Sequence, residues 1–222
     1  MTDVTELTTH RGTHVQMIHH PDFGMTCYMD GLVQSSEFDE AVYHRALVSG
    51  AMRCVPRARR ALILGGGEGA TAREILRSTF MEHVDMVEWD RDVIALFRDR
   101  YPQWGKYAWT DPRLHLHTED AFSFVETLLT PYDVIVVDLF DPEEGDLLRW
   151  VDLVRALERI LAPNGAIVMY TGMYEPAVLK TVYDLLTETV SCLPNHARVP
   201  YRVAIPSFEG ESTFLLFRPP WI

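Results

Sequence analysis

Apolar and polar positions along this chain follow two patterns that succeed one another repeatedly. Short runs rich in Val, Ile and Leu, typical of buried strands, are each followed by a stretch with apolar residues at helical spacing. Strands are expected at 59–65, 83–89, 113–119, 132–140 and 166–172, and helices at 70–80, 91–101, 120–129, 147–161 and 175–190. Strands that alternate with helices predict an α/β fold, in which helices cover both faces of a mostly parallel sheet.

The C-terminal end of the chain departs from this alternation. Residues 201–208 and 212–219 both have the composition of strands, but only a short connection that contains glycine lies between them. A connection of this length joins antiparallel strands. We therefore expect a terminal antiparallel pair, which brings the sheet to seven strands.

The N-terminal end predicts a smaller β structure. Residues 14–20 and 25–31 read as strands, and the PDFG between them is a turn signal. They predict a β-hairpin, which is followed by a helix at 39–50. We therefore divide the chain into a short N-terminal β-hairpin segment, residues 1–35, and an α/β domain, residues 36–222.

Composition and charge disfavour several classes of function. The 222 residues include no run of about 18 uncharged apolar residues and no apolar signal core at the start, so we expect a cytoplasmic protein without membrane contact. A formal charge of −12 disfavours nucleic acid as a partner, because a polyanion requires a basic face. Cys27, Cys54 and Cys192 form no CxxC pair, which predicts neither a disulfide framework nor a zinc site.

The first strand of the expected parallel sheet ends in three consecutive glycines, in the stretch LILGGGEGA. In open α/β sheets the first strand-to-helix turn is the usual place for a nucleotide or an adenosyl group. Gly65 and Gly67, together with Gly66 and Gly69, let the backbone approach a ligand without an intervening Cβ atom. The alternative is that these glycines serve only the packing of the helix against the strand.

Acidic residues near the ends of the next strands favour adenosine over pyrophosphate. Glu88 comes about 20 residues after the glycine turn, where a carboxylate accepts hydrogen bonds from ribose hydroxyls. Asp120 follows the third strand, and it either receives an adenine amino group or caps the next helix. Glu68 lies inside the glycine turn, where its carboxylate would repel a phosphate.

The fourth strand ends in two carboxylates, in the stretch DVIVVDLFDP. Asp138 ends the strand, and removing its carboxylate from water costs free energy unless a cation compensates. We therefore expect Asp138 to hold a cation or to accept a proton. Asp141 precedes a proline, and it serves either the same ligand or a turn.

These motifs, taken in order, resemble the polyamine aminopropyltransferases, the family of spermidine, spermine and thermospermine synthases. YMDGLVQSSEFDEAVYHRALV, residues 28–48, resembles the signature LDGxxQxxxxDExxYHE, and GGGEGATARE, VEWD, TEDAF and DLFDP follow in the order of the family. GGGEGATARE, the EEG after DLFDP, and IPSF are similar to the thermospermine branch in particular. The resemblance implies a Rossmann-like fold of the class I methyltransferase type.

The resemblance also implies a role for each matching residue. The donor nucleoside would contact Gln34, Gly65, Gly67, Glu68, Glu88 and Asp120. The acceptor amine would contact Tyr43, His44, Asp138, Asp141 and Phe208. Tyr43 and Asp138 would be catalytic, because desolvation beside the tyrosine and proton acceptance by the carboxylate free the attacking lone pair. A turn role for Gln34 and helix packing for Tyr43 and His44 are the alternatives.

The implied reaction moves an aminopropyl group from decarboxylated S-adenosylmethionine to a polyamine such as spermidine, and it releases methylthioadenosine. The donor is a co-substrate, and neither a permanently bound cofactor nor a metal is required. Two alternatives stay open, namely an amine N-methyltransferase that uses intact S-adenosylmethionine and a catalytically idle adenosyl-binding protein. Glu68 disfavours the first, because it would oppose the carboxylate of that donor. Tyr43, Asp138 and Asp141 together disfavour the second.

Two parts of the sequence depart from the family pattern. Relatives generally have a larger N-terminal β domain that contributes to dimerisation, so a homodimer is an open question for this chain. The stretch EEGDLLRW after DLFDP lacks the GPAxxLF segment of spermidine synthases, so the sequence does not decide which amine is the acceptor.

Overall fold

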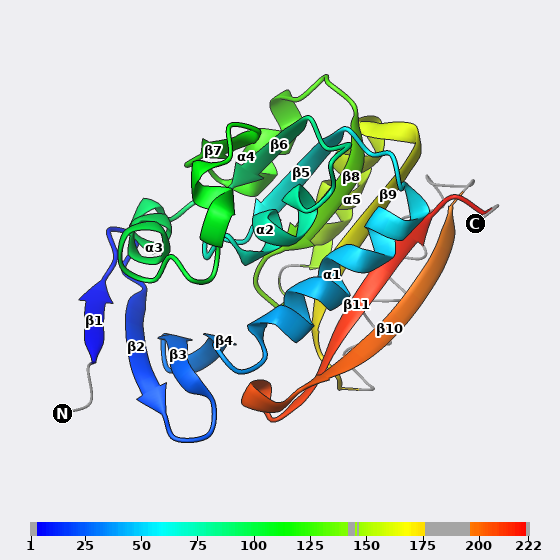
Figure 1. Ribbon diagram of the computed structural model, residues 1–222. Helices are drawn as coiled ribbons and strands as arrows, with labels where there is room; N and C mark the ends of the chain where they lie inside the picture. Colours follow the sequence, from blue (N-terminus) through cyan, green and yellow to red (C-terminus); the bar gives the residue numbers. More distant parts are fainter. Residues whose placement is uncertain (1–3, 142–144, 146, 176–195, 221–222) are drawn as a thin grey trace.

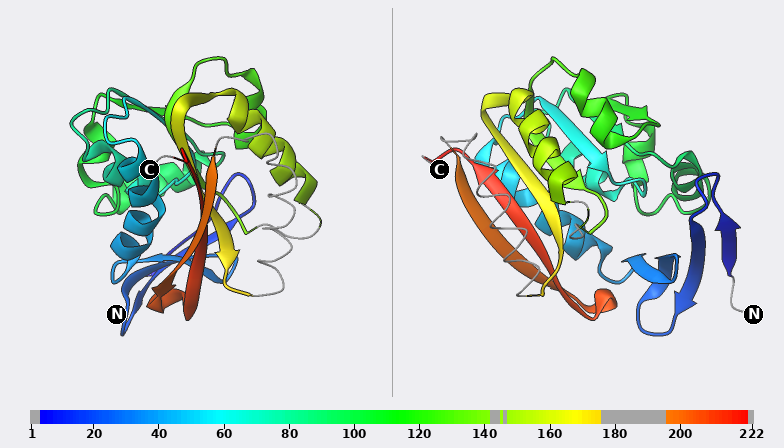
Figure 2. Two further views of the ribbon diagram at one scale, coloured as in Figure 1. Left: turned by 90° about the vertical axis from the view of Figure 1, so that its right-hand side faces the viewer. Right: turned by 180° about the vertical axis from the view of Figure 1, so that it is seen from behind.

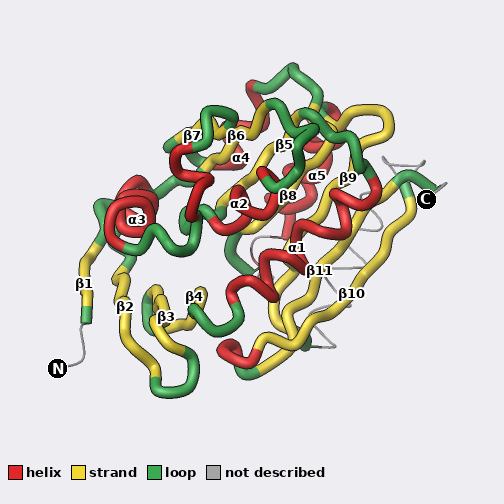
Figure 3. The backbone as a smooth tube through the Cα atoms, viewed as in Figure 1, coloured by secondary structure: helices red, strands yellow, loops and turns green. Residues whose placement is uncertain are grey.

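The computed structural model describes residues 4–141, 145, 147–175 and 196–220, which form two β-sheets and the helices packed on them. A four-stranded antiparallel sheet has the order β1-β2-β3-β4, and a seven-stranded sheet has the order β10-β11-β9-β8-β5-β6-β7. The two sheets, with the helices between and around them, can be followed in Figure 1 and Figure 3.

The seven-stranded sheet is mostly parallel, which confirms the expected fold class. Its strands are β5 (Arg60–Gly65), β6 (His83–Val87), β7 (Leu114–His117), β8 (Tyr132–Asp138), β9 (Leu161–Met173), β10 (Ala197–Ile205) and β11 (Gly210–Arg218). Strands β5 to β9 pair in parallel, whereas β11 is antiparallel to both β9 and β10. The terminal antiparallel pair is therefore present and extends the parallel sheet at one edge.

Alternate residues of the central strands point into two separate cores. Ile63 of β5 and Val136 of β8 belong to the core that α1 (Glu40–Cys54) and α2 (Ala70–Leu76) cover. Leu64 and Val137, one position further along each strand, belong to the core under α4 (Ala121–Thr127) and α5 (Leu147–Arg159). A strand that is buried on both faces needs apolar residues at nearly every position. The near-continuous apolar runs of β5 and β8 therefore follow from their burial under helices on both faces.

The remaining helical segments are short. α3 (Arg91–Ala95) continues as a π-helical segment, Leu96–Arg100, and 3₁₀ segments occur at Lys106–Thr110 and Pro206–Phe208. Most of the helix expected at 175–190 lies outside the described residues, as does Cys192. In the part of the chain that is described, Cys27 and Cys54 are buried free thiols, and no helix is long and apolar enough to cross a lipid bilayer.

The N-terminal sheet contains the expected hairpin and two further strands. The hairpin is formed by β2 (His14–His20) and β3 (Gly24–Met29), to which β1 (Thr5–Thr8) and β4 (Leu32–Ser36) add at either side. Asp30 and Gly31 both have positive φ, as a two-residue hairpin turn requires. This Asp-Gly pair is the signal for β4 that the hydrophobic pattern does not carry, because LVQSS is half polar.

The N-terminal sheet packs against the segments that follow β6. Val15, Met17 and Cys27 form a third apolar cluster with Phe97 and Trp104. Figure 2 shows β1 and the terminal strand β10 on opposite sides of the molecule, whereas β4 lies against the 3₁₀ segment Pro206–Phe208 between β10 and β11. The division of the chain at residues 35 and 36 stays a prediction.

Candidate active site

The glycine turn and the carboxylate of the fourth parallel strand meet where β5 pairs with β8. Gly65 lies opposite Asp138 in this pairing and has a φ of +87°. A Cβ atom on Gly65 would overlap the backbone carbonyl oxygen of Asp138. Gly65 is therefore required by the close approach of the neighbouring strand, in addition to any approach of a ligand.

Two hydroxyl groups hold the carboxylate of Asp138. The Tyr43 hydroxyl donates to Oδ1 at 2.8 Å, and the Thr71 hydroxyl donates to Oδ2 at 2.9 Å. Burial raises the pKa of Asp138 above its usual value, and the negative charge of Glu68 adds to this effect, although both hydroxyls oppose it. The result is a carboxylate that is oriented and more basic than an exposed aspartate.

Three aromatic rings lie close to the ring of Tyr43. Its ring centroid lies 5.7 Å from that of Tyr170, 5.8 Å from that of Phe208 and 5.5 Å from that of Phe214. Burial raises the pKa of the Tyr43 hydroxyl, and the charge of Asp138 raises it further, so Tyr43 stays a proton donor to Asp138. The structure thus brings together three predicted residues, Tyr43, Asp138 and Phe208, in one partly apolar environment.

Asp141 follows β8, and its carboxylate lies beside Gly172 near the end of β9 and beside the hydroxyl of Tyr170. Its Oδ2 would be 3.6 Å from a Cβ atom placed on Gly172, where the backbone has a φ of +99°. Burial raises the pKa of the Tyr170 hydroxyl, and the neighbouring Asp141 carboxylate raises it further. Asp141 is exposed, and it therefore offers a charge at the outer side of the cluster that Tyr43 and Asp138 form.

His44 and Glu68 are in direct contact. His44 Nε2 forms a short ion pair with Glu68 Oε1, while its Nδ1 lies 2.6 Å from the backbone carbonyl oxygen of Glu40. Burial alone would lower the pKa of His44, but the negative charge of Glu68 and hydrogen bonds to Glu40 and Glu68 raise it well above its usual value. The helix that carries Tyr43 therefore also reaches the glycine turn.

Glu88 and Gly67 lie side by side at the end of β6. A Cβ atom on Gly67 would come within 2.9 Å of both Cγ and Oε2 of Glu88, so the glycine leaves the space that this carboxylate occupies. Glu88 Oε1 accepts a 3.0 Å hydrogen bond from the backbone N–H of Asp90. Burial raises the pKa of Glu88 to about 7; the backbone N–H of Asp90 lowers this pKa, whereas the negative charge of Asp90 raises it.

Asp120 caps a helix. Its Oδ1 accepts hydrogen bonds from the backbone N–H of Ser123 at 2.9 Å and from the Ser123 hydroxyl at 3.0 Å. The capping alternative from the sequence is therefore present, whereas contact of Asp120 with adenine stays a prediction.

Gln34 stands at a bulge in β4. Cys27 pairs with Ser35, but the next residue of β3, Tyr28, pairs with Val33, so Gln34 is the extra residue. A bulge redirects the side chain of its extra residue. Gln34 is exposed, and its role at the nucleoside stays a prediction.

Sequence reasoning missed several residues that hold the site together. Thr71 is one, and its only signal is a hydroxyl in the first turn of the helix after the glycines. Asp39 is another: its carboxylate accepts 2.7 Å hydrogen bonds from the Ser36 hydroxyl and from both the N–H and the hydroxyl of Ser207, which fixes the segment that carries Phe208. Trp109 is a third, because its ring occupies the space beside Gly69 that a Cβ atom would need.

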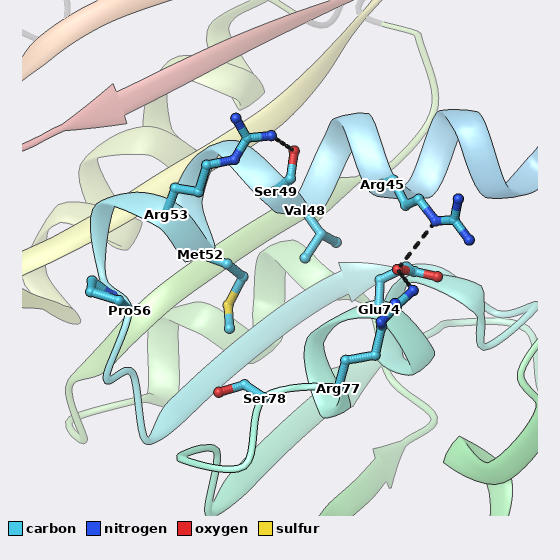
Figure 4. Close-up of a pocket in the computed structure, with 9 residues that line it drawn as sticks. All are labelled: Arg45, Val48, Ser49, Met52, Arg53, Pro56, Glu74, Arg77 and Ser78. Carbon is cyan, nitrogen blue, oxygen red and sulfur yellow. Dashed lines mark hydrogen bonds and ion pairs between the residues drawn. The ribbon is translucent and has the colours of Figure 1, made fainter.

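Two other features lie apart from this cluster. A hollow of about 470 Å³ between α1 and α2 contains none of the predicted site residues (Figure 4). Its charged lining includes Arg45, Arg53 and Arg77. His10, Asp90 and Asp92 bring possible metal-ligand atoms within 4.8 Å of one another, but hydrogen bonds from His10 to Asp92 account for their proximity, so we assign no metal to them.

The fold and this arrangement define the class: a Rossmann-like α/β protein of the methyltransferase type, in which ligands bind beyond the carboxyl ends of the strands. Residues 40–217 match the spermine/spermidine synthase domain, and the chain belongs to this family. The resemblance inferred from the motifs is therefore confirmed at the level of the family.

Curated relatives support this assignment, and a solved structure shows the same fold. A polyamine aminopropyltransferase of Pyrobaculum calidifontis is 39% identical over 204 residues, which cover 88% of this chain and 68% of that protein. Polyamine aminopropyltransferase 1 of Hyperthermus butylicus is 35% identical over 199 residues, which cover 87% of this chain and 67% of that protein. The crystal structure of spermidine synthase from Thermotoga maritima aligns with a TM-score of 0.83 at 23% identity, covering 97% of this chain and 72% of that one, which shows a shared fold.

Proposed function

We propose that the protein is a polyamine aminopropyltransferase, which transfers the aminopropyl group of decarboxylated S-adenosylmethionine to a polyamine and releases methylthioadenosine. The observation that carries the proposal is the carboxylate of Asp138, held by the hydroxyls of Tyr43 and Thr71 beside the glycine turn. Membership of the spermine/spermidine synthase domain family supports the same reaction. A spermidine synthase of this fold has been solved with the transition-state analogue AdoDATO.

The chemistry needs a neutral amine and a fixed direction of attack. The donor is a sulfonium, and a nucleophile that attacks the neighbouring methylene carbon breaks the C–S bond and leaves neutral methylthioadenosine. A free polyamine nitrogen has a pKa near that of lysine, about 10, and arrives protonated. Asp138 accepts this proton, and the raised pKa of its carboxyl favours the transfer.

Tyr43 and the neighbouring rings assist the deprotonation. They replace water around the attacking nitrogen, and removal of water disfavours the ammonium form of an amine. The Tyr43 hydroxyl keeps Asp138 in one orientation, so that the nitrogen it anchors approaches the donor carbon in line. Holding two reactants in line supplies several kcal/mol of the acceleration, as a rough magnitude.

Glu68, Glu88, Gln34 and Asp120 are proposed to bind the donor. Glu88 accepts hydrogen bonds from the ribose, Asp120 receives the adenine amino group, and Gln34 contacts the ribose or sulfur side. Glu68 attracts the terminal ammonium of the aminopropyl chain, and its charge repels the carboxylate of intact S-adenosylmethionine. This repulsion separates the proposed reaction from methyl transfer.

Product analysis tests the proposal against methyl transfer. The protein is incubated with a panel of amines and either donor, and the products are identified by mass spectrometry. We expect methylthioadenosine and an amine extended by one aminopropyl group with the decarboxylated donor. A methylated amine and S-adenosylhomocysteine would overturn the proposal, and binding of either donor without turnover would indicate an adenosyl-binding protein.

Calorimetry tests the role of Glu68 separately. We expect decarboxylated S-adenosylmethionine to bind more tightly than S-adenosylmethionine. In Glu68→Gln the difference between the two affinities should be smaller. Equal affinities of the wild-type protein for the two donors would contradict the repulsion by Glu68.

The proposed acceptor is spermidine or another amine longer than putrescine. Phe208 replaces the tyrosine usual in spermidine synthases and offers an apolar wall for the methylenes between nitrogens, while Asp141 offers a charge further out. Glu143 and Glu144, the two glutamates of the EEG stretch after DLFDP, lie outside the described residues. In competition assays, spermidine should have a higher kcat/KM than putrescine. A clear preference for putrescine would overturn this choice of acceptor but not the proposal of aminopropyl transfer.

A cytoplasmic location and a homodimer complete the proposal. The small polar substrates of the family support the cytoplasmic location, and the dimerisation that the resemblance implies for relatives supports the homodimer. Light scattering coupled to size-exclusion chromatography measures the mass in solution, and a single 25.5 kDa species would argue against the dimer.

A further inference from the structure

A row of three buried charged side chains lies behind Glu68. His44 is 2% exposed, Arg73 is 4% exposed and Glu40 is 8% exposed. His44 and Glu40 come from α1, and Arg73 comes from α2, the helix that follows the glycine turn. None of the chemistry proposed above uses Glu40 or Arg73, yet buried ions are costly unless they are paired.

The hydrogen bonds of His44 show where its protons lie. Its Nδ1 is 2.6 Å from the carbonyl oxygen of Glu40, and a carbonyl oxygen only accepts, so Nδ1 carries a proton. Its Nε2 faces the carboxylate of Glu68, and an ionised carboxylate also only accepts. Both ring nitrogens therefore carry protons, and His44 is an imidazolium.

Glu40 supplies a second negative charge beside this imidazolium, in addition to that of Glu68. Its Oε2 lies 3.4 Å from His44 Nδ1, while Arg73 binds both oxygens, Nη1 to Oε1 at 2.9 Å and Nη2 to Oε2 at 2.8 Å. Burial alone would raise the pKa of Glu40, but the hydrogen bonds from His44 and Arg73 lower it to about 2. Glu40 is thus an anion at any physiological pH, placed between two cations.

Arg73 is itself held in place. It donates to the backbone carbonyl oxygen of Trp104, and its Nε donates to Glu74 Oε1 at 3.1 Å. The guanidinium can therefore give its two terminal nitrogens to Glu40 in one fixed orientation, which is the geometry that suits a carboxylate.

We propose that Glu40, oriented by Arg73, is a positioning residue for aminopropyl transfer: it keeps His44 doubly protonated, so that Nε2–H fixes the Glu68 carboxylate where the terminal nitrogen of the donor chain binds. This inference rests on the proposed function. A neutral His44 would give its single proton to the Glu40 carbonyl oxygen, and its Nε2 lone pair would then face the Glu68 carboxylate and repel it.

The position of Glu68 explains why it needs such a partner. It lies in a turn where Gly66 and Gly69 both have positive φ, and its neighbours on either side are glycines. The carboxylate that receives one end of the propyl chain decides how the carbon bonded to sulfur is presented to the amine. The other titratable groups that face His44 or Glu68 are Tyr43 and Asp138, with Cys27 of β3 near Glu68.

The test compares two ligands that differ at the terminal nitrogen. Methylthioadenosine lacks the aminopropyl chain, so its affinity does not depend on Glu68, whereas decarboxylated S-adenosylmethionine carries the ammonium. The variants are Glu40→Gln and, if the single variant folds poorly, the double variant Glu40→Gln/Arg73→Met, which removes both members of the buried Arg73–Glu40 ion pair. Arg77→Met, at an exposed arginine of the same region, is the matched control.

We expect the double variant to bind decarboxylated S-adenosylmethionine about 10-fold more weakly and methylthioadenosine with an affinity within about 2-fold of wild type. Nitrogen NMR should show an imidazolium for His44 in the wild-type protein at pH 7.5 and a neutral ring in the double variant. Arg77→Met should match wild type in all three measurements.

The outcomes separate the inference from the function. If the wild-type protein is active and the double variant loses affinity for both ligands equally, Glu40 is only structural. This result would overturn the inference but not the proposed function. A neutral His44 in the active wild-type protein would do the same. A wild-type protein that forms no aminopropylated amine would overturn the proposed function and the inference with it.

Discussion

Tyr43 and Asp138 lie 95 positions apart in the sequence, and the hydroxyl of the tyrosine donates a 2.8 Å hydrogen bond to Oδ1 of the aspartate. The bond joins the first long helix to the end of a central strand. It also places the proposed proton acceptor at the border of an aromatic cluster, because the same tyrosine ring contacts Tyr170 and Phe208. In the proposed reaction, proton acceptance by Asp138 and desolvation of the amine beside Tyr43 would therefore both depend on this one contact.

Removing the charge of Asp138 should abolish most of the turnover. Asp138→Asn keeps the shape and one acceptor oxygen but no longer accepts a proton, so kcat should fall roughly 100-fold or more. Calorimetry should find the affinity for methylthioadenosine nearly unchanged, since Asp138 is assigned to the amine. Asp152→Asn, at an exposed residue of α5, serves as the control, and near-wild-type turnover in Asp138→Asn would assign the proton to another group.

Tyr43→Phe should shift the pH dependence of the reaction. The hydroxyl stabilises the ionised form of Asp138, so its loss raises the pKa of that carboxyl further. The carboxyl group of Asp138 must be ionised to accept a proton, and the acid limb of the kcat/KM profile should therefore move to higher pH. We also expect kcat at the optimum to fall about 10-fold, as for loss of a hydrogen bond to a charged group. An unchanged acid limb would show that Asp138 does not control it.

Glu88 should make nucleoside binding depend on pH. Its pKa of about 7 means that the carboxyl is mostly protonated at pH 6 and mostly ionised at pH 8. Ribose hydroxyls donate to the ionised form, so the affinity for methylthioadenosine should rise with pH and should be about 10-fold weaker at pH 6 than at pH 8. Calorimetry of Glu88→Gln should give a weak and pH-independent affinity. A wild-type affinity that falls as pH rises would contradict the ribose contact.

Gly65→Ala should destabilise the fold and the site together. The added Cβ atom would overlap the carbonyl oxygen of Asp138, and φ is unfavourable for alanine, so we expect a loss of about 2 to 4 kcal/mol in the free energy of unfolding. Gly31→Ala is the matched control: φ is also positive there, but nothing lies within 4 Å, and the cost should be about 1 kcal/mol. Urea unfolding followed by circular dichroism measures both, and equal losses would mean that the contact with Asp138 does not matter.

The parallel sheet could be predicted from the sequence because burial on both faces leaves a strong signal. Strand β8 is apolar at successive positions, and the glycine turn marks the end of β5. Strands β1 and β4 were not predicted, because they are short, half polar and paired at the rim of a small sheet. Their pairing depends on turns such as Asp30-Gly31 and on contact with later segments, which a local pattern does not contain.

The site could be predicted only in part, for a related reason. Residues at the strand ends, such as Asp138 and Glu88, could be found because a parallel sheet places all such ends at one edge. Thr71 and Arg73 act through partners distant in sequence, and nothing in their local surroundings indicates these contacts. Glu40 lies one helical turn before His44, but its contact with Arg73 spans 33 positions and has no local signal. Asp120 differs from these residues, because its contact with Ser123 is local and could be predicted as a helix cap. Its contact with a ligand has to be tested by experiment.

The hydrogen bonds from Ser207 to Asp39 have a consequence for how the protein is made. They span 168 positions, so the start of the helix that carries Tyr43 and His44 gains these anchors only after nearly the whole chain has been synthesised. Contacts of such long range form late, because closing the intervening loop costs entropy. At roughly 5 to 20 residues per second, a nascent chain spends on the order of ten seconds or more with an unfinished helix start. A partly made chain would therefore contain the glycine turn and Glu88 before Phe208 joins Tyr43 and Asp138.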